Sequence, residues 1–239
     1  MFSSSAHVYD AIYAALGKDY VAESAALVEL VLVRHPRAAT WLDVACGTGA
    51  HLEHLRRRFA VEGVDLDAAM LGRARERLPG VALHVADYRT LALGRTFDVV
   101  SCLFGSIGYA DGEAELRAAV ASMAAHLAPG GVLVVDGWLR PEAWRDGVVQ
   151  VVVAEDGTRR IVRVGRSRLE GGRAHIEMHH LVADPEGVEH LVDHHRLTLF
   201  APEAYASALR AAGLAVEVVA APSPGRDRYV ALAPDARPG

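Results

Sequence analysis

The chain has 239 residues, 51% hydrophobic and 23% charged, which fits one large α/β domain or one domain with a sizeable insertion. The net charge of −5 gives no support to a general role in binding nucleic acid or an anionic membrane. No apolar run approaches the length of a membrane span, and the start, MFSSSAHVYD, lacks the blocks of a signal peptide. Cys46 and Cys102 lie in apolar runs, which indicates buried thiols in a reducing compartment. We therefore expect a cytoplasmic protein that binds neither nucleic acid nor a membrane.

The first part of the chain predicts a helical segment and then alternating strands and helices. Within residues 8–35, apolar positions such as Val21, Ala25 and Val28 recur at helical spacing. Short apolar runs cover residues 41–45, 61–64, 81–85, 97–103 and 131–135, and helical patterns cover residues 49–59, 67–78 and 112–127. The segment APGG, residues 128–131, is typical of a turn that ends a helix before the fifth strand. This alternation indicates βαβ units and a parallel sheet buried on both faces.

The pattern changes between residues 148 and 199. Alternating segments at about 148–153, 160–169, 173–183 and 188–199 are separated by the turn signals EDGT, EGG and DPEG. They predict a small antiparallel sheet. A helix at about 202–212 and strands at 214–219 and 228–233 follow, and the tail APDARPG is expected to be disordered.

The expected fold is α/β, with a doubly wound, mostly parallel sheet of seven strands and a small antiparallel sheet inserted after strand five. We expect residues 1–137 and 200–239 to form one domain with an N-terminal helical cover, and residues 138–199 to form the insertion. In a doubly wound sheet, ligands bind outside the carboxyl ends of the strands. Residues at strand ends are therefore the first candidates for a site.

The stretch WLDVACGTGAHLEHL, residues 41–55, is the strongest motif. Gly47 and Gly49 supply two glycines of a dinucleotide fingerprint, but its third small position is Leu52. A phosphate loop of the Walker type needs a lysine, which this stretch lacks. Asp43 lies on the strand, where a carboxylate would repel a pyrophosphate and suit a ligand with a positively charged part. We expect the loop backbone to hold a cationic or zwitterionic cofactor, which disfavours a nicotinamide oxidoreductase.

Two more carboxylates follow neighbouring strands. Asp65 ends the second strand, about 20 residues after the loop, where an acid can accept from both hydroxyls of a ribose. Asp87 follows the third strand, where an acid can take the amino group of an adenine. Three acids at strand ends beside a Gly-x-Gly turn favour a nucleoside cofactor over the alternative that they only cap loops and helices.

This set of motifs resembles the class I S-adenosylmethionine-dependent methyltransferases, which have a Rossmann-like fold. The segments that match are LDVACGTG, GVDLD, HVADY, FDVVSCL and LAPGGVLVV, between residues 41 and 135. The resemblance implies that the methionine part is held by Ala45, Gly47 and Gly49, the ribose by Asp65, and the adenine by Asp87. It also implies neighbours of the adenine, which are Leu66, Met70 and Tyr88.

A narrower resemblance covers nearly the whole chain. VYDAIYAALGKDY, FGSIGY, HHRLTLF, AAGLAVE and PSPGR look like segments of the N,N-dimethyltransferases that finish desosamine- and mycaminose-type sugars. The substrates of that group are thymidine-diphosphate-linked (dTDP-linked) amino-deoxysugars, and its members carry a similar insertion. The resemblance implies an N-methyltransferase that moves one or two methyl groups to the amine of such a sugar in antibiotic biosynthesis. Dimers are common in the group, so a homodimer is a further expectation.

The same resemblance assigns aromatic side chains to the site. Tyr9 and Tyr13 would flank the sugar nucleotide, and Tyr20 would contact the methionine end. For all three, packing of an amphipathic helix against the sheet is the alternative. Tyr109, in FGSIGY after the fourth strand, would orient the amine or relay its proton. Trp138 would wall the sugar or thymine pocket, or else be a buried structural residue.

Arginine is expected to bind the diphosphate. Arg226 in PSPGR matches the family's terminal Gly-Arg motif and receives this role through bidentate contact. Arg166 and Arg196 are further candidates from the insertion, whereas Arg159 and Arg160 are expected to be solvated.

No metal site is expected. Pairing the last two inserted segments through DPEG places Glu177 opposite His194. The same register places His175 opposite Arg196, with His179 on that face. This spacing can bind a metal, but the arginine would repel a cation.

Three segments depart from the sugar-methyltransferase pattern: ADYRT after strand three, DGWLR after strand five, and GRDR near the end. Because these changes touch the pocket, the sugar, the amine position and the number of methyl groups stay open. One alternative is an O- or C-methyltransferase, or an N-methyltransferase of another small amine. A second is a non-catalytic cofactor-binding protein, which the retained tyrosines, the insertion and Arg226 argue against.

Overall fold

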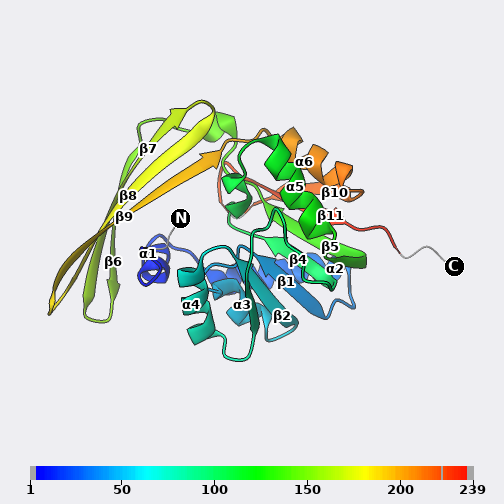
Figure 1. The fold of residues 1–239 in the computed structure, drawn as a ribbon, viewed down its shortest axis with the longest axis horizontal. Helices are drawn as coiled ribbons and strands as arrows, with labels where there is room; N and C mark the ends of the chain where they lie inside the picture. Colours follow the sequence, from blue (N-terminus) through cyan, green and yellow to red (C-terminus); the bar gives the residue numbers. More distant parts are fainter. Residues whose placement is uncertain (1–3, 222, 236–239) are drawn as a thin grey trace.

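The computed structural model describes residues 4–221 and 223–235; residues 236–239 of the predicted tail and Pro222 of PSPGR lie outside them. The main sheet has seven strands in the order β10-β11-β5-β4-β1-β2-β3 (Figure 1). They are β1 (Thr40–Val44), β2 (Ala60–Asp65), β3 (Ala82–Val85), β4 (Phe97–Cys102), β5 (Leu127–Asp136), β10 (Ala215–Ala220) and β11 (Asp227–Leu232). β11 runs antiparallel to β5 and β10, and the other pairs are parallel. The predicted doubly wound sheet is confirmed.

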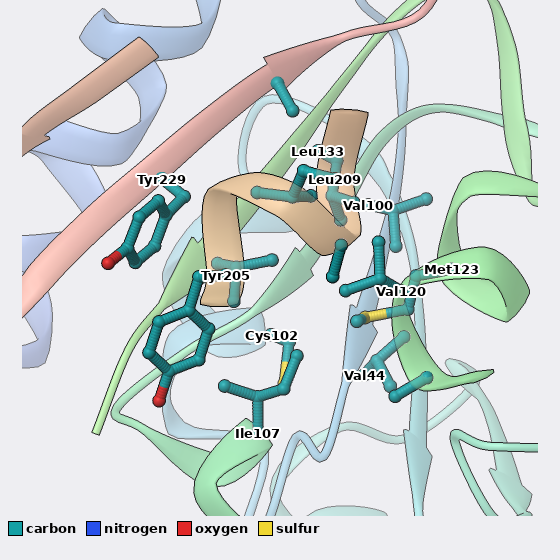
Figure 2. Close-up of a cluster of buried hydrophobic side chains, with 14 of the residues drawn as sticks. Val44, Val100, Cys102, Ile107, Val120, Met123, Leu133, Tyr205, Leu209 and Tyr229 are labelled. Carbon is teal, nitrogen blue, oxygen red and sulfur yellow. The ribbon is translucent and has the colours of Figure 1, made fainter. Parts of the chain in front are cut away.

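Helices cover both faces of this sheet because successive side chains along its strands are apolar and point to opposite faces. One face is covered by α2 (Tyr20–Arg34), α3 (Ala50–Leu55) and α4 (Ala68–Arg77), and the other by α5 (Glu113–Ala124) and α6 (Pro202–Ala211). On β1, Trp41 packs with the first group and Leu42 with the second. Figure 2 shows the second core, where Val120, Leu209 and Leu133 of β5 come together.

The N-terminal segment predicted to be helical over residues 8–35 consists of two helices. α1 (Tyr9–Ala15) ends before Gly17, whose φ of +80° is left-handed, and α2 starts after Asp19. The Asp19 carboxylate accepts from the Ala22 amide at 2.9 Å and so caps α2. Apolar spacing alone did not show the break because both helices keep the helical period.

The prediction for the start of β5 was wrong. α5 ends at Ala124 and β5 begins at Leu127, so the APGG segment lies inside the strand. Phe97 of β4 pairs with Leu127, but Val99 pairs with Val132, so the register shifts between the two. The segment is therefore a bulge-like irregularity within the strand, and its sequence alone resembles that of a turn.

The insertion forms a separate antiparallel sheet in the order β6-β7-β8-β9, and it follows β5 in sequence. Its strands are β6 (Val149–Asp156), β7 (Arg159–Glu170), β8 (Arg173–Asp184) and β9 (Gly187–Thr198). The predicted register is confirmed, with Glu177 opposite His194 and His175 opposite Arg196. Its inner face packs against the N-terminal segment, and Figure 1 shows α1 lying between the two sheets.

Candidate active site

The loop after β1 has an unusual backbone. Ala45, Gly47 and Gly49 have φ angles of +58°, +56° and +74°, so three residues in five are left-handed. The Gly47 amide donates to Oδ2 of Asp65 at 2.8 Å, and the Asp67 amide donates to Oδ1 of Asp65, also at 2.8 Å. The acid at the end of β2 therefore holds the loop.

The small residue that the fingerprint lacks at Leu52 is supplied elsewhere. A Cβ on Gly63 of β2 would lie 2.8 Å from Leu52 Cδ1, so Leu52 packs directly over this glycine. A Cβ on Gly49 would lie 2.6 Å from Leu78 Cδ1. Gly49 therefore allows the segment after α4 to approach, and it is not among the cavity-lining residues given below. Gly49 therefore has a packing role, and its contact with a cofactor stays a prediction.

A cavity of about 290 Å³, the strand-end cavity, lies outside β1, β2 and β3. Seven side chains or backbone segments assigned to a cofactor line it, namely Ala45, Gly47, Asp65, Leu66, Met70, Asp87 and Tyr88. Burial raises the pKa of Asp65, although the amides of Asp67 and Gly47 oppose this. The structure thus brings together residues from Ala45 to Tyr88, which are 43 positions apart in the sequence.

A smaller cavity, the loop cavity of about 40 Å³, lies beneath the glycine loop. Tyr20 and Asp43 line it. Asp43 is buried, its Oδ1 accepts from Ser101 Oγ at 2.6 Å, and burial raises its pKa to about 6. Within residues 4–221 and 223–235, no basic side chain lies within ion-pair distance of Asp43. The Asp43 carboxylate is a suitable acceptor for the amino group of a zwitterion, because a bound cation would favour its ionised form.

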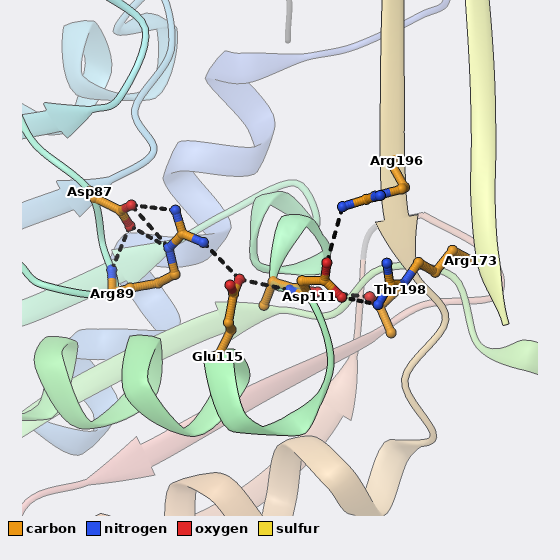
Figure 3. A network of polar contacts seen from close by, with 8 residues as sticks. Asp87, Arg89, Asp111, Glu115, Arg173, Arg196 and Thr198 are labelled. Atoms are coloured by element: carbon orange, nitrogen blue, oxygen red, sulfur yellow. Dashed lines mark hydrogen bonds and ion pairs between the residues drawn. The ribbon is translucent and has the colours of Figure 1, made fainter. Parts of the chain in front are cut away.

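Asp87 has a partner that the sequence analysis did not predict. Its carboxylate accepts from Arg89, whose Nε lies 2.9 Å from both oxygens, and this contact lowers the pKa of Asp87. Arg89 also donates to Glu115 at 2.8 Å, as Figure 3 shows. Asp87 and Arg89 both line the strand-end cavity, so the pair is presented to it, and the acid already has a partner.

The third cavity, the insertion cavity of about 640 Å³, lies between α1, the loop after β5 and the inserted sheet. Six of the predicted residues line it, namely Tyr9, Tyr13, Tyr109, Trp138, Arg166 and Arg226. The guanidinium carbon of Arg226 lies 4.3 Å from the Trp138 ring centroid and 5.2 Å from that of Phe104. This places a largely buried cation between two aromatic faces.

The other two arginines differ. Arg166 lines the insertion cavity, but its side chain is 69% exposed and pairs with Glu177. Arg196 is absent from the lining, because alternation along β9 turns it outward, where it pairs with Asp111 at 3.0 Å. Figure 3 shows this contact. The structure therefore does not bring Arg196 to the cavity.

The lining residues that escaped prediction include Arg163, Lys18 and His195. Arg163 of β7 is 3% exposed and lies 5.7 Å from the Tyr13 ring. Lys18 pairs with Glu23 and lies 3.8 Å from the Phe104 ring centroid. His195 of β9 faces inward. Arg163 lies two residues after the buried Ile161 on β7, so the alternation of side chains along the strand could have indicated that it faces inward. Lys18 could have been singled out because it is the only lysine of the sequence.

The three cavities meet. Tyr9 and Ser106 line all three, and Tyr109 lines both the strand-end and insertion cavities. Ser106 and Tyr109 lie on η1 (Ser106–Tyr109), the short 3-10 helix after β4. A ligand in the strand-end cavity and one in the insertion cavity would therefore meet beside these hydroxyls.

Two further searches concern the described residues. Within them, no group of three or more histidine, cysteine or acidic side chains is placed to hold a metal ion. None of the helices in this part of the chain is both long and apolar enough to span a membrane.

The strand order and the acids at the strand ends define a class I methyltransferase. A family model described as "Methyltransferase domain" matches residues 42–131. The dTDP-3-amino-3,4,6-trideoxy-alpha-D-glucopyranose N,N-dimethyltransferase of Streptomyces venezuelae is 46% identical, over 95% of this chain and 97% of that protein. The chain belongs to the family of dTDP-amino-sugar N,N-dimethyltransferases.

Two solved structures agree with this. DesVI from Streptomyces venezuelae has a TM-score of 0.91 at 46% identity, covering 96% of this chain and 98% of that one. CalS10, an amino pentose methyltransferase from Micromonospora echinaspora solved with bound S-adenosylmethionine, has a TM-score of 0.85 at 45% identity. The alignment covers 94% of this chain and 96% of CalS10.

Proposed function

We propose that the protein transfers methyl groups from S-adenosylmethionine to the amine of a dTDP-linked amino-deoxysugar, twice in succession, in natural-product biosynthesis. The observation that carries this is the meeting of the three cavities at Tyr9 and Ser106. It joins a nucleoside-sized cavity at the strand ends to a larger one with several cations. The 3-amino sugar is the first substrate to test, because the relative with 46% identity acts on one.

The residues present fit the methyl donor. Asp65 would accept from the ribose hydroxyls, and Asp43 with Tyr20 would hold the methionine amino group. A Cβ on Gly47 would lie 3.3 Å from the Met70 methyl group, so a larger residue would fill this space. S-Adenosylmethionine supplies a methyl group already activated on a positively charged sulfur. For the adenine we propose the lining residues Leu66, Met70 and Tyr88, with the Asp87–Arg89 pair in place of the acid alone.

The insertion cavity would hold the nucleotide sugar. Arg226 faces it from between Phe104 and Trp138, and Arg163 and Lys18 face it as well. Buried cations are suited to a diphosphate, and guanidinium can bind it in a bidentate manner. We assign Arg226 to the diphosphate and Trp138 to the wall of the sugar or thymine site. Arg166 remains a candidate for contact with the substrate at the exposed rim of the cavity, and we do not assign Arg196 to the substrate.

The chain's own contribution to the transfer would be alignment and exclusion of water. Tyr9 and Tyr13 on α1 would cover the reacting atoms from one side. Tyr109 would contact the amine from the other, and the released proton would leave through the insertion cavity. Because the inserted sheet supplies part of that cavity's wall, residues 138–199 form the proposed substrate unit, and residues 1–137 and 200–239 form the cofactor unit.

The test is mass spectrometry of the protein incubated with S-adenosylmethionine and a dTDP-3-amino-3,6-dideoxyhexose. Successive gains of one and two methylene masses support the proposal. The 3-hydroxy analogue serves as control, and its methylation in place of the amine would favour an O-methyltransferase. Binding of S-adenosylmethionine with no turnover of either sugar would leave another small amine or a non-catalytic role.

We also propose a cytoplasmic homodimer, formed through the outer face of the inserted sheet. Val149, Val151 and Val153 on β6 are 60–67% exposed on this face. Such an apolar row is suited to a second copy of the same sheet. Val151→Lys is expected to yield a monomer in sedimentation, whereas Val33→Lys on α2, at a valine 74% exposed, is the matched control.

A further inference from the structure

A contact across the insertion cavity links the two sheets of the molecule. The hydroxyl of Tyr109, on η1 after β4, lies 2.7 Å from Nδ1 of His195 on β9. Both side chains line the insertion cavity, and Tyr109 also lines the strand-end cavity. The inserted sheet therefore contributes a group that touches the tyrosine at the meeting point of the cavities.

The direction of this contact depends on the histidine tautomer. Its length of 2.7 Å lies in the usual range for an O–H donor. Burial lowers the pKa of His195 to about 4; the nearby Asp193 opposes the shift, and His180 and Arg163 add to it. Burial raises the pKa of Tyr109, so the phenol keeps its proton. In the tautomer whose Nδ1 carries no proton, the hydroxyl hydrogen is directed at that nitrogen of the neutral imidazole.

We propose that His195 is a positioning residue, which commits the Tyr109 hydroxyl to act as a hydrogen-bond acceptor toward the substrate amine and so limits transfer to two methyl groups. With its hydrogen directed at Nδ1, the tyrosine offers only oxygen lone pairs to the cavity. A neutral amine can donate one N–H to that oxygen while its own lone pair faces the methyl donor. This inference rests on the proposed function.

The number of N–H groups then counts the transfers. Each transfer forms a C–N bond, breaks the C–S bond of the donor, and leaves an ammonium that loses one proton to water. A primary amine has two N–H groups, and the secondary amine formed first still has one to donate to Tyr109. The tertiary amine formed next has none, so nothing orients its lone pair and the product leaves. The acceptor thus matters most for the second transfer, where a single N–H remains.

The test measures single-turnover rates of the first and second transfers, using dTDP-3-amino and dTDP-3-methylamino sugars and mass spectrometry. Tyr109→Phe and His195→Leu should each slow the second transfer about tenfold more than the first, the size expected for one hydrogen bond. The monomethyl product should then accumulate. The double variant should be no slower than Tyr109→Phe alone, because the histidine acts through the tyrosine.

Two further variants separate positioning from structure. His195→Asn places an amide oxygen near the Nδ1 position and should restore the wild-type product ratio. His194→Leu, at the neighbouring residue on the outer face, should leave it unchanged. If His195→Leu does not fold, the single variants Tyr109→Phe and His195→Asn together decide the matter.

Additive losses in the double variant, or equal slowing of both steps, would overturn the inference. A wild-type product ratio for His195→Leu would do the same. Failure of the wild-type enzyme to methylate either sugar would instead reject the proposed function itself.

Discussion

At Asp43, the stability of the ligand-free protein and the affinity for the proposed cofactor should make opposite demands on the side chain. Replacing it with Asn keeps the shape and the acceptor for Ser101 but removes the ionisable group. We expect Asp43→Asn to stabilise the ligand-free protein at neutral pH and at the same time to weaken binding of S-adenosylmethionine. A residue kept only for stability would change both in the same direction.

The magnitude follows from the pKa. Burial raises the pKa of Asp43 from 3.8 to about 6, a shift of about 2 units. A group whose folded pKa is raised stabilises the fold fully below pH 3.8 and loses that contribution as pH rises to about 6. At about 1.4 kcal/mol per unit, ionised Asp43 costs up to about 3 kcal/mol above pH 6. Asp43→Asn should recover up to about this amount at pH 7.5 and progressively less towards pH 4.

The assay is denaturant unfolding of the ligand-free protein between pH 4 and pH 8, with calorimetric binding of S-adenosylmethionine at pH 7.5. Loss of a charged contact should weaken binding by about tenfold to a hundredfold. Asp98→Asn is the matched control. Burial would raise the pKa of Asp98, but the amides of Ala39 and Thr40 lower it overall, so this variant should destabilise at pH 7.5. If Asp43→Asn also destabilised at pH 7.5, the reasoning would be refuted.

Three further outcomes are expected. Arg226→Ala should raise KM for the nucleotide sugar about tenfold or more in steady-state assays, whereas Arg166→Ala at the exposed rim should have little effect; equal effects would contradict the diphosphate role. Gly63→Ala should destabilise by about 1–3 kcal/mol in denaturant unfolding, because its Cβ would lie 2.8 Å from three side chains, whereas Gly72→Ala, in open space on α4, should stabilise by about 0.5–1 kcal/mol. Ala45→Gly should raise the free energy of unfolding by about 1 kcal/mol, because an alanine with a φ of +58° is strained; no gain would mean that the loop holds no such strain.

The residues that line the strand-end and loop cavities could be predicted to lie together because their signals are local. Asp43 lies one residue before the end of β1, Asp65 ends β2 and Asp87 follows β3. Parallel strands bring their carboxyl ends to one edge of the sheet. Turn residues also set the hairpins of the insertion, so that even the pairing of Glu177 with His194 was predicted correctly. What the local pattern did not reveal was that Asp87 already has a partner in Arg89.

The substrate half depends on which face of a strand each residue occupies and on what packs there. Along β9, His195 faces the cavity and Arg196 faces away, and a shift of one residue would exchange them. The sequence shows the alternation, but only the packing of α1 against the inserted sheet decides which face is inside.

By itself, then, the sequence determined the order of strands and helices, the glycine loop and the acids at the strand ends, because periodicity and turn chemistry act over a few residues. The tertiary structure alone decided that Gly63 makes room for Leu52 and that three cavities meet at Tyr9. It also placed Tyr109 against His195, 86 positions further along the chain. These are contacts between distant segments, and they form only where two separately folded surfaces come together.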